Sequence, residues 1–306
     1  MNISKITLGT AQIGFDYGIA NKIGKLEFQT SMEILHFAYN NGINTFDTAP
    51  DYGNSEEIIG KFISSKIKNQ DKAPIIISKM PPFKPNQYID YNSVYNYIKN
   101  QINKSISSLN LKSIPIYLIH HAKDILFREN LIIECLEQIK KEGLINRFGV
   151  SVYNPEEVER LLKFKEMDVI QVPINIFDRR MITTKSLKKL KQNNYLIFAR
   201  SIYLQGLFFI PPEKLPKHLE RAKEYLVKLR NLVNELNTNV AKLAFLYVRD
   251  LPEVSSLVIG SESIEQLSEN INLLKEKPLS NDIYQRINEE FENISEKIIN
   301  PSLWDK

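Results

Sequence analysis

The chain has 306 residues, of which 43% are hydrophobic and 25% are charged, and its formal net charge is +4. A chain of this length can bury a large core, either in one α/β domain or in two ordinary ones. Its lysines and arginines are spread along the chain and form no basic stripe with interleaved aromatics, which argues against nucleic acid as a partner.

The N-terminal residues and the single cysteine predict a cytoplasmic protein. No long apolar run follows a positive start at residues 1–10, and no run approaches the ~20 residues of a membrane span, so we expect neither secretion signal nor membrane partner. Cys135 cannot form an internal disulfide, which suits a reducing compartment, and we expect it to be a buried hydrophobic side chain. Because the four histidines have no carboxylate at ligand spacing, we expect no metal site.

Short β-branched runs alternate with amphipathic stretches of helical length along the chain. The expected strands lie at residues 5–10, 43–47, 74–80, 114–121, 145–152, 168–175, 195–201 and 255–261. The expected helices lie at residues 31–42, 54–66, 91–110, 130–143, 154–164, 181–193, 217–236, 239–250 and 263–274, and a further amphipathic helix lies at residues 280–299.

Eight strand–helix units with nearly continuous apolar strands predict an α/β protein of the (β/α)8 TIM barrel type. We expect one domain over residues 1–306, with a C-terminal helical tail at about 280–306, because no low-complexity linker marks a boundary. A doubly wound open sheet is the competing architecture. It is not supported, because the first strand continues into "LGTAQIG" and not into a G-x-G-x-x-G phosphate-binding turn.

Catalytic groups of such a barrel come from the carboxyl ends of its strands. Polar residues stand at these ends, namely Asp47, Lys79, His120, His121, Ser151, Gln171, Arg200 and Ser201. A lysine that ends an apolar strand is costly to bury alone, so we expect Asp47 on the neighbouring strand to pair with Lys79. Tyr52 follows in the loop and could place its hydroxyl over that pair. We expect the ammonium to lower the pKa of this phenol below its reference value of ~10, which would poise a proton donor against a developing alkoxide.

Six segments along residues 6–275 together resemble the aldo-keto reductase superfamily. They are, in order, "GINTFDTAPDYGNSE", "IISKM", "IYLIHH", "GLINRFGVSVYNPEEVERL", "VIQVPIN" and "VIGSESIEQLSENI". The resemblance implies a catalytic tetrad of Asp47, Tyr52, Lys79 and His120. Tyr52 would be the general acid that protonates the carbonyl oxygen, Lys79 held by Asp47 would tune it, and His120 would orient the substrate.

The resemblance also implies a nicotinamide cofactor, NADP(H) or NAD(H), extended across the mouth of the barrel. Ser151 and Gln171 would bind the carboxamide, and Gly9 and Thr10 would lie beside the cofactor. The further contacts implied are Ser201, Leu204 and Gly206 at the diphosphate and Gly260, Ser261, Gln266, Glu269 and Asn270 at the adenosine end. Asp47 and Arg200 complete the expected cofactor-binding set.

Three residues depart from the family's usual pattern. Val152 stands where an asparagine often follows the serine of strand five. Arg200 stands where an aromatic commonly stacks on the nicotinamide, and its guanidinium could stack there or bind an anionic substrate or phosphate. A lysine or arginine usually meets the 2′-phosphate of NADPH around the positions of Gly260 and Gln266, but here Glu262 stands close by, which moves the expectation from NADPH toward NADH or dual use.

The expected substrate is a small carbonyl or alcohol compound, with a polar molecule such as a keto-sugar favoured. Its binding residues would be Tyr52, His120, His121 and Tyr17. We favour His120 over His121 for the catalytic place because it directly follows "IYLI". Strand alternation would put the two rings on opposite faces unless the strand has ended.

The function expected from these residues is that of an NAD(P)-dependent aldo-keto reductase, which reduces an aldehyde, ketone or keto-sugar to an alcohol or catalyses the reverse. An alternative is a nicotinamide-binding regulatory barrel with little or no turnover. A third is an isomerase or lyase on the same barrel. The sequence leaves the physiological substrate and the oligomeric state open.

Overall fold

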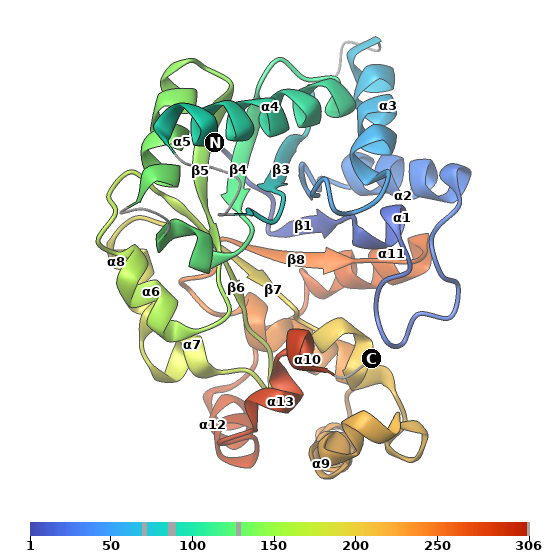
Figure 1. The fold of residues 1–306 in the computed structure, drawn as a ribbon. Coiled ribbons are helices and arrows are strands. Elements are labelled where there is room, and N and C mark those ends of the chain that lie inside the picture. The colour runs from blue at the N-terminus through green and yellow to red at the C-terminus, as the bar shows by residue number, and fades with distance from the viewer. Residues whose placement is uncertain (69–71, 85–89, 127–129, 305–306) are drawn as a thin grey trace.

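Eight parallel strands form a closed barrel with helices around it in the computed structural model of the chain (Figure 1), which confirms the predicted fold. The structure describes residues 1–68, 72–84, 90–126 and 130–304. Each strand pairs with its neighbours in chain order, and β8 closes the ring against β1. The strands are β1 (Ile6–Gly9), β2 (Thr45–Asp47), β3 (Ile75–Met80), β4 (Ile114–Ile119), β5 (Ile145–Ser151), β6 (Val169–Pro173), β7 (Leu196–Arg200) and β8 (Ser256–Gly260).

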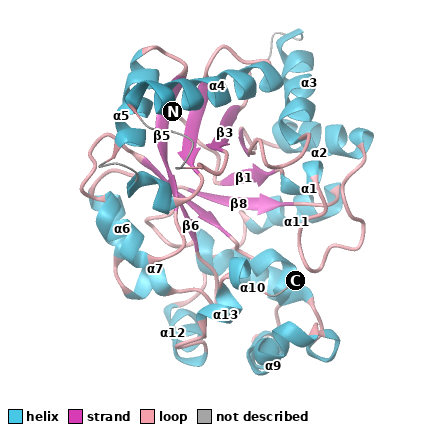
Figure 2. Cartoon of the chain, viewed as in Figure 1, coloured by secondary structure: helices cyan, strands magenta, loops and turns pink. Residues whose placement is uncertain are grey.

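The α-helices lie outside the strands (Figure 2). They are α1 (Ala11–Gly14), α2 (Phe28–Asn40), α3 (Ser55–Lys68), α4 (Tyr91–Leu109), α5 (Leu131–Lys141), α6 (Pro155–Leu161), α7 (Arg180–Thr183), α8 (Ser186–Gln192), α9 (Lys223–Glu235), α10 (Val240–Arg249), α11 (Ile264–Leu273), α12 (Asn281–Glu290) and α13 (Glu296–Ile299). Short 3₁₀ helices follow several of the strands and helices, namely η2 (Ala122–Leu126), η3 (Leu204–Phe209), η4 (Pro212–Lys214), η5 (Lys217–Ala222) and η6 (Pro301–Leu303).

The alternation of side chains along the strands separates two hydrophobic cores. A small inner core fills the barrel and contains Ile77, Ile116, Leu118, Val169 and Phe198. The outward-facing side chains pack against the helices in a much larger cluster. Because alternate residues share a face, the strand ends that carry on from the inner core also face the interior at the mouth. These inward positions are Gly9, Asp47, Lys79, Ser151, Gln171, Arg200 and Gly260.

Three helices that the periodicity predicts as continuous are interrupted. The expected helix at 181–193 is divided into α7 and α8, because Lys185 has a left-handed φ of 62°. The expected helix at 217–236 begins as η5 before it becomes α9. The tail helix expected at 280–299 ends at Glu290 and resumes as α13, and Asn293 between them has φ 56°. A left-handed residue cannot continue a right-handed helix, and hydrophobic periodicity does not reveal such a residue.

The C-terminal tail packs onto the segment that follows β6. Arg179 donates hydrogen bonds to Asn288 (2.8 Å) and to the carbonyl of Phe291 (3.1 Å). The rings of Phe177 and Phe291 lie 5.1 Å apart. These contacts join the tail to the barrel; its last two residues, 305 and 306, lie outside the described part.

The remaining general expectations concern membranes, metals and Cys135. None of the helices in the described part of the chain is long and apolar enough to cross a bilayer. Among the described residues, no group of three or more His, Cys, Asp or Glu side chains is placed to hold a metal ion. Cys135 is free and buried on α5, and burial raises its pKa to about 12. It therefore packs as a small hydrophobic side chain.

Candidate active site

Asp47, Lys79 and Tyr52 meet at the mouth of the barrel. Lys79 Nζ lies 2.9 and 2.8 Å from the two carboxylate oxygens of Asp47, and both residues are almost fully buried, at 1% and 3% exposure. The same ammonium donates to the carbonyl of Thr48 (3.0 Å) and lies 3.3 Å from the Tyr52 hydroxyl. Gln171 donates to Asp47 from the far side of the barrel (2.8 Å). The structure thus brings together the three groups that the strand-end pattern singles out.

The loop that carries Tyr52 is held by a chain of hydroxyl groups. The Thr48 hydroxyl donates to Ser55 (3.1 Å), Ser55 donates to Thr10 (2.8 Å), and Thr10 donates to the carbonyl of Asp47 (2.9 Å). The Thr10 hydroxyl, expected beside the cofactor, therefore also fixes this loop.

Gly14, at the end of α1, lets the same loop pack closely. A Cβ at this position would lie 1.6 Å from the Tyr52 carbonyl oxygen. Gly14 was not among the residues expected from the sequence. Nothing in its local sequence shows that a loop 38 residues later presses against it.

The pKa of Tyr52 shifts in the opposite direction to the one expected. Burial raises it above its usual value, the charge of Asp47 raises it further, and the charge of Arg200 opposes the rise. The expected lowering by Lys79 is absent because the carboxylate of Asp47, in contact with Lys79, offsets the ammonium charge. At neutral pH Tyr52 consequently keeps its proton and is able to donate it.

His120 and His121 lie on the same side of the site. β4 ends at Ile119, so strand alternation no longer separates them, and the two rings stack 5.1 Å apart at 18°. The His120 ring lies 6.4 Å from that of Tyr52, and its Nδ1 is 3.8 Å from a carboxylate oxygen of Asp51. Burial lowers the pKa of His120, Asp51 opposes this shift and Lys79 adds to it. The imidazole is therefore neutral at pH 7.

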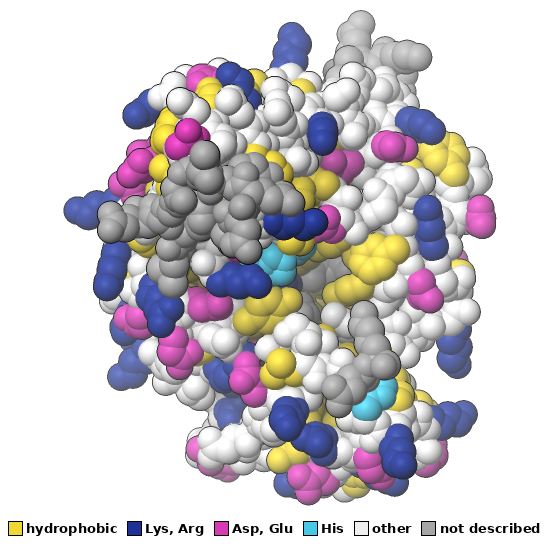
Figure 3. Space-filling model, viewed as in Figure 1, with side chains coloured by type: hydrophobic (Ala, Val, Ile, Leu, Met, Phe, Trp, Pro, Cys, Tyr) yellow, Lys and Arg dark blue, Asp and Glu magenta, His cyan; other side chains and the backbone are white. Residues whose placement is uncertain are grey.

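A cavity of about 440 Å³ opens beside Tyr52 and runs between the loops after β1, β7 and β8. The view onto the barrel mouth shows a histidine near its centre, with hydrophobic and basic side chains around it (Figure 3). The expected residues that line the cavity are Gly9, Thr10, Tyr17, Asp47, Tyr52, Gln171, Arg200, Ser201, Gly206, Gly260, Gln266, Glu269 and Asn270. Those that do not line it are Lys79, His120, His121, Ser151, Leu204 and Ser261.

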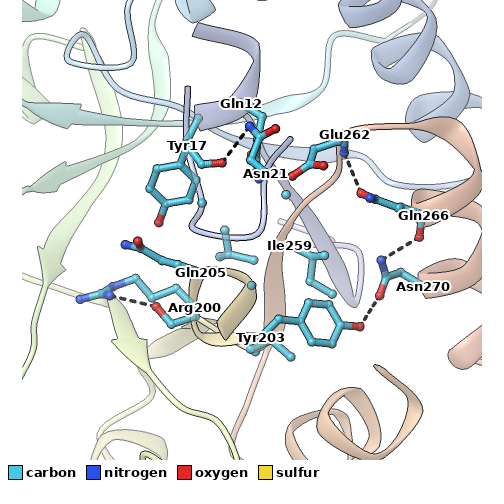
Figure 4. Close-up of a pocket in the computed structure, with 18 of the residues that line it drawn as sticks. Gln12, Tyr17, Asn21, Arg200, Tyr203, Gln205, Ile259, Glu262, Gln266 and Asn270 are labelled. Carbon is cyan, nitrogen blue, oxygen red and sulfur yellow. Dashed lines mark hydrogen bonds between the residues drawn. The ribbon is translucent and has the colours of Figure 1, made fainter. Parts of the chain in front are cut away.

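One end of the cavity is a hydrogen-bonded network on the β8–α11 side (Figure 4). The side-chain oxygen of Gln266 accepts a hydrogen bond from the backbone N–H of Glu262 (2.9 Å), and the backbone carbonyl of Gln266 accepts one from the side chain of Asn270 (2.8 Å). Tyr203 donates to Asn270. This network orders the side chains that the resemblance assigns to the adenosine end.

Several lining residues were not expected from the sequence. They are Ala11, Gln12, Gly18, Ala20, Asn21, Ile202, Tyr203, Gln205, Phe209, Ala241, Val258, Ile259 and Leu273, together with Glu262, which was expected only as a departure from the family pattern. Gln12, Tyr203 and Gln205 come just after strands, so the strand-end rule could have included them. Gly18, Ala20 and Asn21 come from the long loop after β1, and no local signal places them at the cavity.

A model of the aldo/keto reductase family matches residues 5–291. The chain belongs to the aldo/keto reductase family. It is accordingly an oxidoreductase of the kind that interconverts carbonyls and alcohols with a nicotinamide cofactor.

The similarity to individual family members is distant but covers nearly the whole chain. An uncharacterized oxidoreductase of Bacillus subtilis (strain 168) is 26% identical over 293 residues, covering 92% of this chain and 90% of the relative. The NADH-specific methylglyoxal reductase of Escherichia coli (strain K12) is 24% identical over 299 residues, covering 90% of each. The holo structure of an aldo-keto reductase from Bacillus halodurans has a TM-score of 0.77 at 21% identity, covering 99% of this chain and 96% of that one. At that identity the structural likeness concerns the fold.

The cavity of this aldo/keto reductase fits the cofactor of its family. Ser261 stands between the lining residues Gly260 and Glu262, and its buried Oγ has no hydrogen-bond partner among the described residues, which leaves it available to a polar ligand group if this loop shifts on binding. In the loop after β7, Ser201, Leu204 and Gln205 have positive φ values of 62°, 47° and 53°, which are costly for residues other than glycine. Strained backbone of this kind concentrates where ligands are held.

The structure changes the picture of two cofactor contacts that the family resemblance implies, those of Gln171 and Arg200. Gln171 donates one amide N–H to Asp47, so its second N–H and its carbonyl oxygen are left to bind a carboxamide. Arg200 does not extend across the cavity. Its guanidinium lies 4.2 Å from the centre of the Tyr153 ring and donates to the carbonyl of Val152 (3.0 Å) and to Ser201 (3.3 Å).

Proposed function

We propose that the protein reduces a small polar aldehyde or ketone to an alcohol, or catalyses the reverse, with Tyr52 as the proton donor. The observation that carries the proposal is the buried Lys79–Asp47 pair, whose ammonium lies 3.3 Å from the Tyr52 hydroxyl at the edge of the cavity. Bound in this cavity, a nicotinamide cofactor would supply the hydride.

Each residue of the site then has a distinct role. Tyr52 gives its proton to the carbonyl oxygen as negative charge develops there. Lys79 holds that hydroxyl in place and places a positive charge beside the oxygen, and Asp47 keeps the ammonium oriented. His120, neutral and beside Tyr52, can hydrogen-bond the same carbonyl oxygen and so orient the substrate.

Replacing Tyr52→Phe tests the assigned acid. The variant keeps the ring and loses the proton, so we expect kcat for carbonyl reduction to fall by about 10²–10⁴ while the Kd for the cofactor stays near that of the wild type. Tyr117→Phe is the matched control, because that phenol is buried and has no hydrogen-bond partner among the described residues. Wild-type turnover by Tyr52→Phe would show that another group donates the proton.

We further propose that NADH is the preferred cofactor. Two carboxylates, Glu262 and Glu269, line the cavity, and Arg200 is the one lysine or arginine among its described lining residues. The 2′-phosphate of NADPH carries a charge of about −1.5 to −2, so acids near it would oppose its binding.

The ratio of kcat/KM for NADH to that for NADPH measures this preference. We expect a ratio of at least about tenfold in the wild type, which Glu262→Gln should reduce because it removes a repulsive charge. Glu265→Gln on the same turn should leave it unchanged, since Glu265 does not line the cavity. A wild-type preference for NADPH would contradict the assignment.

The same measurements distinguish the proposed reductase from a regulatory barrel. Such a protein would bind NADH or NADPH, seen by quenching of protein fluorescence, without turning over any member of a carbonyl panel. The proposed reductase requires turnover that depends on Tyr52.

A further inference from the structure

We propose that Arg200 is an anion-binding subsite, and that the carbonyl substrate carries a carboxylate or phosphate group that this guanidinium binds. The inference deepens the proposed function, because it names the class of substrate that the same cavity would accept. It also assigns Arg200 to the substrate, whereas the family resemblance assigns this position to the cofactor.

Arg200 is placed to meet a molecule that reacts at Tyr52. It ends β7 at a position that faces the barrel interior, and it lines the same cavity as Tyr52 and Tyr17. Burial raises the pKa of both phenols, and the charge of Arg200 opposes the rise in each case. The guanidinium is therefore close enough to act electrostatically on the groups beside the reaction centre.

The side chain is held in position without being neutralised. Among the described residues it contacts the carbonyl of Val152, the hydroxyl of Ser201 and the face of Tyr153, all of which are uncharged. Among the described residues no carboxylate lies within ion-pair distance of it. Since a guanidinium has five N–H donors and two are used by these bonds, three are left for a ligand.

A neighbouring arginine shows how this chain neutralises such a charge elsewhere. Arg180 donates to both carboxylate oxygens of Asp178 at 2.9 Å and also contacts Glu296. Its NH2 group donates to the carbonyl of Tyr153, the same residue on which Arg200 stacks. Both arginines thus contact Tyr153, but of the two, only Arg180 has acidic partners among the described residues.

The acids of the cavity are engaged or lie away from Arg200. Both oxygens of Asp47 accept bonds from Lys79, and one accepts a further bond from Gln171. Glu262 and Glu269 belong to the β8–α11 side, and Glu262 lies across the cavity from Arg200 (Figure 4). An incoming anion consequently has no protein carboxylate to displace.

A planar guanidinium with free N–H groups matches carboxylate and phosphate oxygens, which it can bind in a bidentate manner. The Tyr153 ring and the Val152 carbonyl fix the plane of the guanidinium before the ligand arrives, which limits the loss of side-chain entropy on binding. Carbonyl compounds with a terminal acid group therefore fit the site better than neutral ones of equal size.

Matched pairs of aldehydes test the subsite with NADH as cofactor. Succinic semialdehyde and butanal differ in a carboxylate, and D-glyceraldehyde 3-phosphate and D-glyceraldehyde differ in a phosphate. We expect the wild type to favour the charged member of at least one pair by at least about tenfold in kcat/KM. The pair with the larger ratio identifies which anion the subsite accepts.

Arg200→Gln should remove most of that ratio while the Kd for NADH changes less than about twofold, and Arg200→Lys should keep part of it because the charge remains. Arg160→Gln is the control, because it removes the same charge from an exposed position on α6 and should leave the ratio intact. An unchanged ratio in Arg200→Gln overturns the proposal. So does an equal loss for both members of a pair together with weaker NADH binding, because Arg200 would then serve the cofactor.

Failure of the proposed reaction can be distinguished from failure of the proposed anion subsite. If the wild type reduces neither member of either pair, calorimetric titration of the NADH-bound protein with glycerol 3-phosphate, succinate and glycerol still reports on the subsite. Binding of an anion that Arg200→Gln abolishes supports the subsite even though the reaction is wrong. No binding of either anion by the wild type overturns it.

Discussion

The electrostatics around Tyr52 depend on how two neighbouring charges offset each other. A lysine close to a phenol would by itself favour the phenolate and lower the pKa. Here Asp47 contacts that lysine through both carboxylate oxygens, and burial together with the Asp47 charge raises the pKa of Tyr52. The hydroxyl stays protonated through the neutral range, as a proton donor must.

Asp47→Asn should reveal this balance in the pH profile of carbonyl reduction. A donor with a raised pKa is fully active below that pKa and loses activity as the pH rises through it. We therefore expect kcat/KM of the wild type to show no basic limb up to about pH 9, since even an unperturbed tyrosine has a pKa of ~10. In Asp47→Asn the Lys79 charge is no longer offset, so the pKa of Tyr52 should fall and a basic limb should appear at lower pH.

Asp51→Asn provides a graded control for this prediction. The charge of Asp51 also raises the pKa of Tyr52, but it is the smallest of the causes and its side chain is 42% exposed. Removal of the Asp51 charge should also move the basic limb to lower pH, but by less than Asp47→Asn does. A basic limb in the wild type below pH 8, or none in Asp47→Asn, would contradict this account of the site.

At the scale of elements, two loops that are far apart in the chain meet beside the cavity. We call residues 18–21, in the loop after β1, the strap. Within it Ile19 donates to the carbonyl of Gln205 in the loop after β7 (3.0 Å). A Cβ added to Gly206 would lie 2.7 Å from that of Ala20. The absence of a side chain at Gly206 thus lets the strap approach the β7 loop.

Gly206→Ala should weaken cofactor binding by forcing the strap away. The φ of 89° adds backbone strain of about 1–2 kcal/mol to the steric clash. Gly143→Ala separates the two effects, since Gly143 also has a left-handed φ (79°) but a Cβ there meets nothing within 4 Å. We expect both variants to lose thermal stability and only Gly206→Ala to raise the Kd for NADH. If Gly206→Ala binds NADH as tightly as Gly143→Ala and the wild type do in fluorescence titrations, the contact between the strap and the β7 loop does not matter for binding.

At the scale of the whole molecule, the C-terminal tail is part of the packed structure. Phe291 is 1% exposed and packs on Phe177, while its carbonyl accepts a bond from Arg179. Tyr284 on α12 donates to the carbonyl of Tyr247 on α10 (2.8 Å). The tail therefore covers hydrophobic surface of the barrel on the side of β6 and α10 (Figure 1).

Phe291→Ala should destabilise the protein by about 3–5 kcal/mol, the usual loss for truncating a buried phenylalanine. Leu303→Ala, at a position 47% exposed, should change stability by less than about 0.5 kcal/mol. Urea unfolding followed by circular dichroism measures both. A small loss for Phe291→Ala would mean that the tail stabilises the barrel little.

The fold was predictable because its signal is repeated eight times. Each β-branched run is short and each helix is amphipathic, so errors at single boundaries leave the barrel unchanged. The errors occur where one residue overrides periodicity, as Lys185 and Asn293 do with their left-handed backbones. Likewise β4 ends at Ile119, two residues before the expected end, and this allows the His120 and His121 rings to stack.

The candidate site was predictable where it follows strand ends. Asp47, Lys79, Gln171 and Arg200 were found because ionisable or amide side chains that close apolar strands stand out from their surroundings. The strap and Gly14 were missed, since their importance depends on which distant loop they touch.

By itself, the sequence determined the barrel, the family and the set of polar groups at its mouth, because these depend on local pattern and on the order of motifs. Only the tertiary structure decided the protonation of Tyr52, the contact between strap and β7 loop, and the absence of an acidic partner for Arg200 among the described residues. Each of these depends on distances between residues far apart in the chain, and burial sets the strength of the charges involved.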